Sequence, residues 1–213
     1  MANVITLTRL LLIFPLAAMI YWASPGWRWL APPLLLLIIA LDGLDGYVAR
    51  KRLETSVFGS IFDIAADRVI EYVLWTVLAH VGLVPMWVAL VFIIRGTLVD
   101  SIRYAAIAGG ETAFGMMRSR VGRFLVASRS MRGLYGGLKA VTFAWLLAQG
   151  PLAYFEPALW ARWSEAIVLT TGILVYSTVV LCLLRGVPVL VEFAMRHRVF
   201  QIRDTTQTQH VTR

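Results

Sequence analysis

The chain has 213 residues, of which 59% are hydrophobic and only 15% are charged, and its mean hydropathy is +0.74. This balance excludes an ordinary soluble domain and is typical of a polytopic membrane protein. The net charge of +8 indicates a topological bias and attraction to anionic lipid. It argues little for nucleic-acid binding, because no soluble basic domain accompanies it. The first apolar segment lacks a small-residue cleavage site, so we expect a retained first helix.

Six apolar segments are long enough to cross a bilayer, which takes about 20 helical residues. In chain order they are residues 5–23, 31–50, 64–83, 86–108, 134–151 and 164–185. Breakers separate them, at Pro25-Gly26, between Gly82 and Pro85, at Gly109-Gly110 and at Gly150-Pro151. The pattern predicts an all-α fold, a membrane bundle of six transmembrane helices.

Lysine and arginine are distributed unevenly between the two sets of loops. One set holds residues 50–52, the run from Arg118 to Arg132, and the arginines that follow the last segment, whereas the other holds only Arg28 and Arg162. The positive-inside rule therefore predicts a protein of the cytoplasmic membrane with both termini in the cytoplasm. The run from Arg118 to Arg132 is either an ordinary cytoplasmic loop or a binding site for anionic headgroups. Residues 1–203 form the predicted membrane domain, and residues 204–213 form a polar tail.

Four aspartates lie in the second and third segments. Asp42 and Asp45 are three residues apart near the cytoplasmic end of one helix, and Asp63 and Asp67 are four apart near the start of the next. These spacings put each pair on one helix face. The short connecting loop makes the two helices neighbours, so the carboxylates are predicted to converge. Acids near lipid are costly, and carboxylates are the usual ligands of hard divalent cations. We therefore predict a metal site that handles phosphate.

Small residues and a cation accompany the aspartates. Gly46 and Ala49 keep the helix face low enough for a nucleotide or phosphate to approach, and Gly59 gives room before the third segment. The guanidinium of Arg50 suits bidentate contacts with phosphate. A single aspartate would be explained as well by pairing with a nearby arginine, but the whole constellation favours a site.

This stretch resembles the signature D-x-x-D-G-x-x-A-R-(x8)-G-x-x-x-D-x-x-x-D of the CDP-alcohol phosphatidyltransferase family. All its fixed positions match, namely Asp42, Asp45, Gly46, Ala49, Arg50, Gly59, Asp63 and Asp67. The segment from Asn3 to Arg9 resembles the start of the family's first helix, with Ala2 in place of the usual proline. The resemblance implies a membrane enzyme that moves a phosphatidyl group from CDP-diacylglycerol to a small alcohol and releases CMP.

The resemblance also implies cofactors, an assembly and residue roles. Two Mg²⁺ or Mn²⁺ ions, a homodimer and an active site that faces the cytoplasm are expected. The implied metal ligands are Asp42, Asp45, Asp63 and Asp67, with Asp67 as the catalytic base. The implied contacts to cytidine and phosphates are Thr6, Gly46, Ala49, Arg50 and Gly59.

Arginines in the fourth segment point to the acceptor. Arg95 and Arg103 are eight residues apart, about two helical turns, and an arginine deep in a span usually faces a polar cavity. With Lys139 they are predicted to hold a phosphate on the acceptor, and pairing with Asp100 is the structural alternative. The pattern resembles phosphatidylglycerophosphate synthases, although Gly96 replaces a glutamate. Glycerol 3-phosphate is the favoured acceptor, and a phosphatidylinositol phosphate synthase that uses inositol phosphate remains the alternative.

A small membrane transporter or channel is the alternative from another class, because it would also place acids inside a helical bundle. Transporters often show internal repeats and broken helices at mid-membrane. The sequence shows no repeat, and its acids lie near one membrane face, so an enzyme is favoured.

Overall fold

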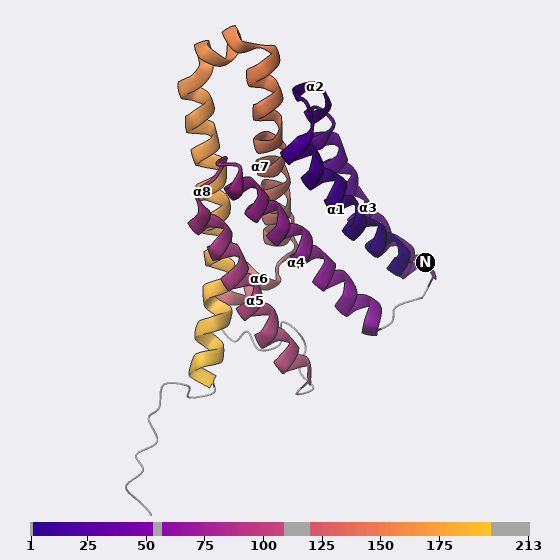
Figure 1. The fold of residues 1–213 in the computed structure, drawn as a ribbon. Helices are drawn as coiled ribbons and strands as arrows, with labels where there is room; N and C mark the ends of the chain where they lie inside the picture. Colours follow the sequence, from indigo (N-terminus) through magenta and orange to yellow (C-terminus); the bar gives the residue numbers. More distant parts are fainter. Residues whose placement is uncertain (1, 53–56, 109–119, 197–213) are drawn as a thin grey trace, which may run out of the picture.

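The computed structural model describes residues 2–52, 57–108 and 120–196 (Figure 1). All secondary structure in these ranges is helical, which confirms the predicted all-α class. The helices are α1 (Ala2–Trp22), α2 (Pro25–Arg28), α3 (Ala31–Arg52), α4 (Val57–His80), α5 (Met86–Ala108), α6 (Arg120–Ala127), α7 (Arg129–Phe155) and α8 (Pro157–Arg196).

Two of the predicted breakers follow helix ends, since α1 ends before Pro25-Gly26 and α4 ends before the turn at Gly82, and Gly109-Gly110 lie outside the described residues. Gly82, with a φ of 78°, ends the turn after α4, and Pro85 precedes α5. The expected end of the fifth segment at Gly150-Pro151 is wrong, because α7 continues through Pro151 to Phe155. Proline removes one backbone hydrogen bond without preventing the next turn. The N–H of Glu156 then donates to the carbonyl of Leu152 at 3.0 Å and ends the helix.

Three stretches among the described residues are long and apolar enough to cross a membrane, namely Asn3–Trp22, Pro25–Leu44 and Pro157–Met195. The other long helices, α4, α5 and α7, carry charged side chains within their apolar faces, and these lower their hydropathy. The six-span count therefore stays a prediction. With 40 residues, α8 is about 60 Å long, roughly twice the thickness of the hydrocarbon core.

The helix α1 packs against both α3 and α4. Among the described residues, α3 also packs on α7, and α4 on α5, but no extensive contact joins α3 directly to α4. The expectation that these two helices are simple neighbours is thus incomplete, because the short loop fixes their order but not what lies between them. Figure 1 shows α1 and α3 side by side, with α4 crossing toward them.

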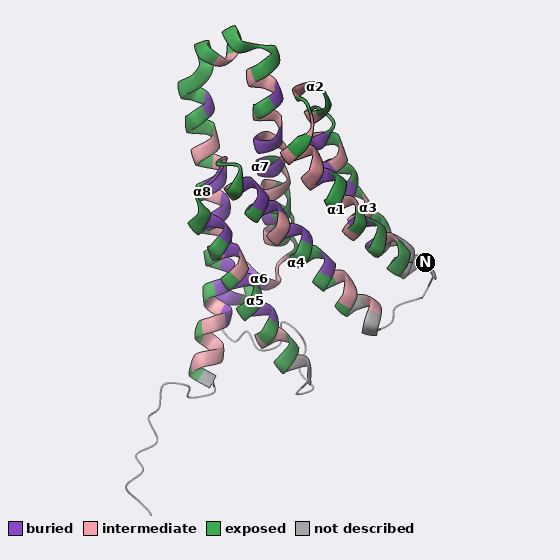
Figure 2. Ribbon diagram, in the orientation of Figure 1, coloured by how far each residue is buried: buried purple, intermediate pink, exposed green. Residues whose placement is uncertain are grey.

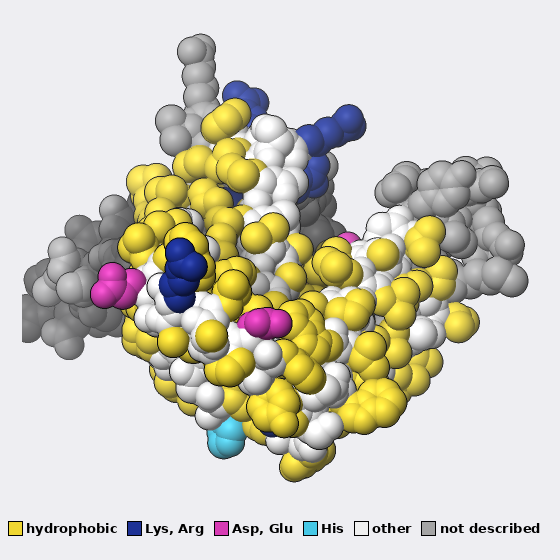
Figure 3. All heavy atoms as spheres, turned by 90° about the horizontal axis from the view of Figure 1, so that it is seen from above, with side chains coloured by type: hydrophobic (Ala, Val, Ile, Leu, Met, Phe, Trp, Pro, Cys, Tyr) yellow, Lys and Arg dark blue, Asp and Glu magenta, His cyan; other side chains and the backbone are white. Residues whose placement is uncertain are grey.

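Aromatic rings form the centre of the bundle. Trp75 of α4 stacks on Phe92 of α5 with 4.4 Å between ring centroids, and Phe143 of α7 lies 4.7 Å from Trp75. Buried residues follow the inner faces of the helices, and exposed residues follow the outer faces (Figure 2). Seen from above, this face of the molecule carries mainly hydrophobic side chains, with a few acidic and basic ones among them (Figure 3).

Candidate active site

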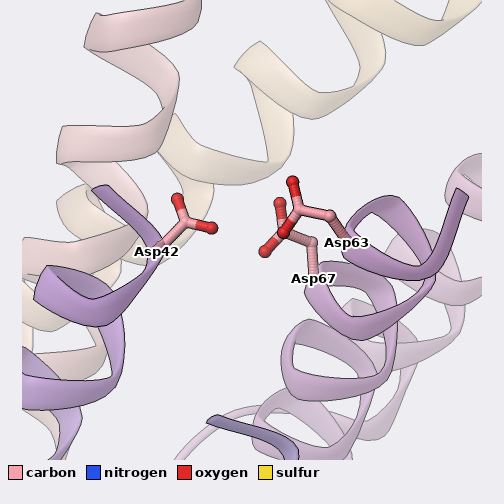
Figure 4. Close-up of side chains that lie close together, drawn as sticks. All are labelled: Asp42, Asp63 and Asp67. Atoms are coloured by element: carbon pink, nitrogen blue, oxygen red, sulfur yellow. The ribbon is translucent and has the colours of Figure 1, made fainter. Parts of the chain in front are cut away.

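Three of the four motif aspartates meet between α3 and α4. Asp42 points from α3 toward Asp63 and Asp67, which project together from the first turns of α4 (Figure 4). One carboxylate oxygen from each lies within 4.8 Å of the others. Their side chains are 44%, 42% and 48% exposed, so a ligand can reach all three. The predicted convergence holds for these aspartates, because the four-residue spacing puts both α4 carboxylates on one face.

A buried arginine from α1 contacts all three carboxylates. Arg9 Nη2 lies 2.6 Å from Asp42 Oδ1 and 2.6 Å from Asp67 Oδ1, and Nη1 lies 3.1 Å from Asp63 Oδ1. The side chain of Arg9 is only 3% exposed. The sequence analysis named Arg9 only as the end of a segment that resembles the family's first helix, and it missed this role. A lone cation in an apolar helix was the available signal, since such a charge needs partners.

The other residues implied for the donor are partly described. Thr6 is buried on α1, one turn before Arg9, and Gly59 lies in the first turn of α4. Four further positions belong to the last turns of α3, and their side chains lie outside the described residues: Asp45, Gly46, Ala49 and Arg50.

The donor set of the cluster fits a divalent metal ion. Asp42, Asp63 and Asp67 supply hard oxygen ligands, which Mg²⁺ and Mn²⁺ prefer. The guanidinium of Arg9 already occupies the same oxygens, so the site is built to hold positive charge. One guanidinium balances only one of three carboxylates, which leaves negative charge for a divalent ion to neutralise.

A cavity of about 590 Å³ extends from the aspartates into the bundle. Asp42, Asp67 and Arg9 line one part of it. Apolar residues line much of the rest, together with basic side chains from four helices, namely Arg68, Arg95, Arg103, Arg132, Lys139 and Arg185. The arginines predicted for the acceptor therefore share one cavity with the aspartates of the motif.

Arg95 on α5 is the least neutralised of these cations. It is 7% exposed, and it forms no hydrogen bond or ion pair with the part of the chain that the structure describes. Its side chain passes over Gly186 of α8, where an added Cβ would lie 2.6 Å from both Cγ and Nε of Arg95. A buried, uncompensated guanidinium that lines a cavity is suited to bind an anion.

The other two predicted acceptor residues have partners in the protein. Arg103 Nη1 lies 3.5 Å from Asp100 Oδ1, and Lys139 Nζ lies 2.9 Å from Glu71 Oε1. Arg68 of α4 hydrogen-bonds to both Asp100 and Glu71 and joins these pairs into one network. The alternative of internal pairing thus applies to Arg103 and Lys139, and both still line the cavity.

Two further cavity residues, Arg185 and Tyr135, were not assigned to the site by sequence reasoning. Arg185 of α8 is 5% exposed, and its Nη1 donates to the carbonyl of Leu125 in α6 at 2.8 Å. The ring of Tyr135 lies between two cations, 4.6 Å from Lys139 Nζ and 5.4 Å from the guanidinium carbon of Arg185. The reasoning applied to Arg95 could have found Arg185, which also interrupts a long apolar stretch of its helix.

The family model of CDP-alcohol phosphatidyltransferases matches residues 1–184, which include α1 to α7, the aspartate cluster and most of the cavity. The chain belongs to this family. Membership agrees with the motif and favours an enzyme over a transporter or channel.

Similar proteins include two named CDP-diacylglycerol--glycerol-3-phosphate 3-phosphatidyltransferase. The one from Mycoplasma genitalium is 30% identical over 142 residues, 62% of this chain and 58% of the relative. The one from Bacillus subtilis is 30% identical over 132 residues, 56% of this chain and 68% of the relative. A phosphatidylinositol phosphate synthase from Cutibacterium acnes is 35% identical over 96 residues, 45% of this chain and 40% of the relative. The match thus spans less than two thirds of the Mycoplasma protein.

Proposed function

We propose that this protein transfers the phosphatidyl group of CDP-diacylglycerol to the hydroxyl of a small phosphorylated alcohol, foremost glycerol 3-phosphate. The acceptor oxygen forms a bond to the phosphorus of the phosphatidyl group. The bond from that phosphorus to CMP breaks, CMP leaves with the electron pair, and the hydroxyl proton passes to a base. The single observation that carries the proposal is the shared cavity, which joins Asp42 and Asp67 of the motif to a wall of arginine and lysine side chains.

The donor end is assigned to the aspartate cluster and its surroundings. Asp42, Asp45, Asp63 and Asp67 would hold two Mg²⁺ or Mn²⁺ ions, which supply Lewis-acid stabilisation of charge on the phosphates. The proposed contacts to cytidine and phosphates are those of the family motif: Thr6, Gly46, Ala49, Arg50 and Gly59.

Asp67 is the proposed base. It has the most exposed side chain of the three clustered aspartates, at 48%, and it lines the cavity that the acceptor would enter. A carboxylate at this position can accept the hydroxyl proton once the alcohol lies within hydrogen-bond reach. Asp63 has contacts with Arg9 but is not among the cavity-lining residues, which favours a ligand role for it.

The acceptor end is assigned to the basic wall of the cavity. Arg95, Arg103 and Lys139 are proposed to bind the acceptor phosphate, and the structure adds Arg185 as a fourth cation in the same wall. Arg95 contributes most, because its charge has no partner among the described residues. An unphosphorylated alcohol would leave the buried charge of Arg95 without an anion, so a phosphorylated acceptor is favoured.

The relatives support glycerol 3-phosphate as the acceptor, because two of them carry that substrate in their names. Inositol phosphate is the second candidate. The relative named phosphatidylinositol phosphate synthase shows the higher identity, 35%, over a shorter match. Both acceptors present a phosphate to the same cations, and they differ in the polyol that must fit the remaining cavity.

The membrane arrangement is part of the proposal. Residues 1–203 form a domain that crosses the inner membrane six times and has both termini in the cytoplasm. The active site opens to the cytoplasmic side of that membrane. Three spans have the required length and hydropathy, and the other three long helices place their charges in the cavity. The tail 204–213 lies outside the described residues. Family resemblance favours a homodimer.

The deciding experiment incubates the purified protein with CDP-diacylglycerol, Mg²⁺ and one alcohol at a time, and it measures CMP release and the lipid product. The panel contains glycerol 3-phosphate, inositol 1-phosphate and glycerol. We expect glycerol 3-phosphate to give the highest kcat/KM. Preference for inositol 1-phosphate would change the acceptor but keep the basic site, and preference for glycerol would contradict the phosphate site itself.

A further inference from the structure

We infer that Arg9 is an internal counter-cation that competes with divalent metal ions for the aspartate cluster and thereby lowers the metal affinity of the resting site. The inference rests on the metal site of the proposed function. It concerns a residue outside the aspartate motif, and it predicts an increase in metal binding when that residue loses its charge.

The contacts of Arg9 are those that a metal ion would need. Its guanidinium reaches Oδ1 of Asp42, Asp63 and Asp67, at 2.6 Å, 3.1 Å and 2.6 Å. These are the three carboxylates that lie close enough together to hold an ion. A metal ion that takes these oxygens as ligands must therefore replace N–H donors of Arg9.

Burial indicates the side from which each cation approaches. Arg9 is 3% exposed, whereas the aspartate side chains are 42–48% exposed. Arg9 thus holds the carboxylates from their buried side, and an ion reaches them from their exposed side. Hydrogen bonds to charged groups contribute roughly 1.5–3 kcal/mol each, so displacing even one of them weakens metal binding measurably.

Arg9 also reduces the repulsion between the carboxylates when no metal ion is bound. Without it, three carboxylates from α3 and α4 would repel one another near the apolar part of the bundle. The α1 helix packs against both of these helices, so the contacts of Arg9 connect all three at the site. Arg9 therefore holds the metal-free site in a conformation ready to receive an ion. The same contacts lower the affinity of the three carboxylates for that ion.

The test measures Mn²⁺ binding to the purified full-length protein without CDP-lipid, from the paramagnetic resonance signal of free Mn²⁺. We expect Arg9→Gln to bind Mn²⁺ about tenfold more tightly than wild type or better, because 1.4 kcal/mol corresponds to a factor of ten. Arg9→Lys keeps the positive charge but loses the planar guanidinium with its several N–H donors, so its Mn²⁺ affinity should lie between those of wild type and Arg9→Gln. Arg28→Gln is the matched control, since Arg28 donates to the Ala23 carbonyl at the far end of α1. Unchanged or weaker binding by Arg9→Gln overturns the inference.

Thermal unfolding gives a second readout. A ligand that binds only the folded state stabilises it by an amount that grows with the logarithm of its concentration relative to its Kd. We expect Mg²⁺, compared with EDTA, to raise the Tm of Arg9→Gln more than that of wild type. If Arg9→Gln does not fold, the same comparison with Arg9→Lys decides, and an equal or smaller Mg²⁺ effect than in wild type contradicts the inference.

These readouts separate the inference from the proposed function. Tighter Mn²⁺ binding by Arg9→Gln in a protein that transfers no phosphatidyl group would support the competition and contradict the reaction. Active wild-type protein with unchanged Mn²⁺ binding in Arg9→Gln would support the reaction and contradict the competition. Absence of Mn²⁺ binding in wild type and variants alike overturns the inference.

Discussion

Lys139 Nζ lies 2.9 Å from Glu71 Oε1, across the cavity wall between α7 and α4. The carboxylate of Glu71 is 6% exposed and is shared with Arg68. Lys139 is therefore partly neutralised within the protein, whereas Arg95 has no such partner among the described residues. The two cations differ in how much charge they offer to an incoming phosphate.

The first prediction compares these cations. Arg95→Ala should raise the KM for glycerol 3-phosphate by roughly ten- to a hundredfold, because hydrogen bonds to charged groups are worth roughly 1.5–3 kcal/mol. Lys139→Ala should raise it less, since Lys139 already bonds to Glu71. Steady-state kinetics at saturating CDP-diacylglycerol measure both. An equal or larger effect of Lys139→Ala would show that Arg95 does not lead in binding the acceptor.

Removing Glu71 should destabilise the fold. Glu71→Gln leaves Arg68 and Lys139 without their buried carboxylate, and breaking a buried ion pair costs on the order of 3 kcal/mol. Titration with SDS, followed by circular dichroism, measures the free energy of unfolding. Glu165→Gln is the control, because Glu165 is an exposed residue of α8 and should change the free energy by less than about 0.5 kcal/mol. Equal stability of the two variants would show that the Glu71 network contributes little.

A methyl group at position 186 should displace Arg95. Gly186→Ala places a Cβ 2.6 Å from Cγ and Nε of Arg95, a distance that forces the arginine to move. We expect the KM for glycerol 3-phosphate to rise by roughly tenfold while the affinity for CDP-diacylglycerol stays unchanged, because overpacking costs about 1–3 kcal/mol. Gly172→Ala on the same helix is the control, since its nearest neighbour, Tyr176, lies 3.9 Å away. Unaltered acceptor kinetics in Gly186→Ala would show that the position of Arg95 is unimportant.

The base assignment predicts a large effect on turnover. Asp67→Asn should lower kcat by on the order of 10²–10⁴-fold, because it removes a proton acceptor while preserving size. Binding of CDP-diacylglycerol should persist, as measured by protection against thermal unfolding. Asp42→Asn should instead weaken metal-dependent binding of the CDP-lipid. Near-normal turnover by Asp67→Asn would assign the base elsewhere.

Topology can be tested by cysteine accessibility in a Cys182→Ala background, since Cys182 is buried and is the chain's single cysteine. Cysteines at positions 25 and 155 should react with an impermeant reagent from outside, and cysteines at 120 and 205 only after the membrane is opened. The reversed pattern would place the active site on the opposite face. Labelling of 25 and 120 from the same side would contradict the six-span count.

The sequence by itself determined the helical class and the composition of the aspartate site. Helix spacing is local, so Asp63 and Asp67 share a face wherever α4 packs. The cost of charge in an apolar helix is also local, and it singled out Arg95 and Arg103 as cavity residues. A local rule also explains the wrong prediction that a helix ends at Pro151. A proline costs the helix one backbone hydrogen bond at its own position, but it does not determine whether the residues after it are helical.

Only the tertiary structure decided which charges meet. Arg9 is 33 residues from Asp42 and 58 from Asp67 in the sequence, and no spacing rule relates them. Their contact depends on α1 packing against both α3 and α4. Likewise, Lys139 bonds to Glu71, and Arg95 extends over Gly186, because helices distant in sequence pack together. Buried charges are neutralised by whatever neighbours the packing supplies, so the division between paired and available cations follows from the three-dimensional arrangement of the helices.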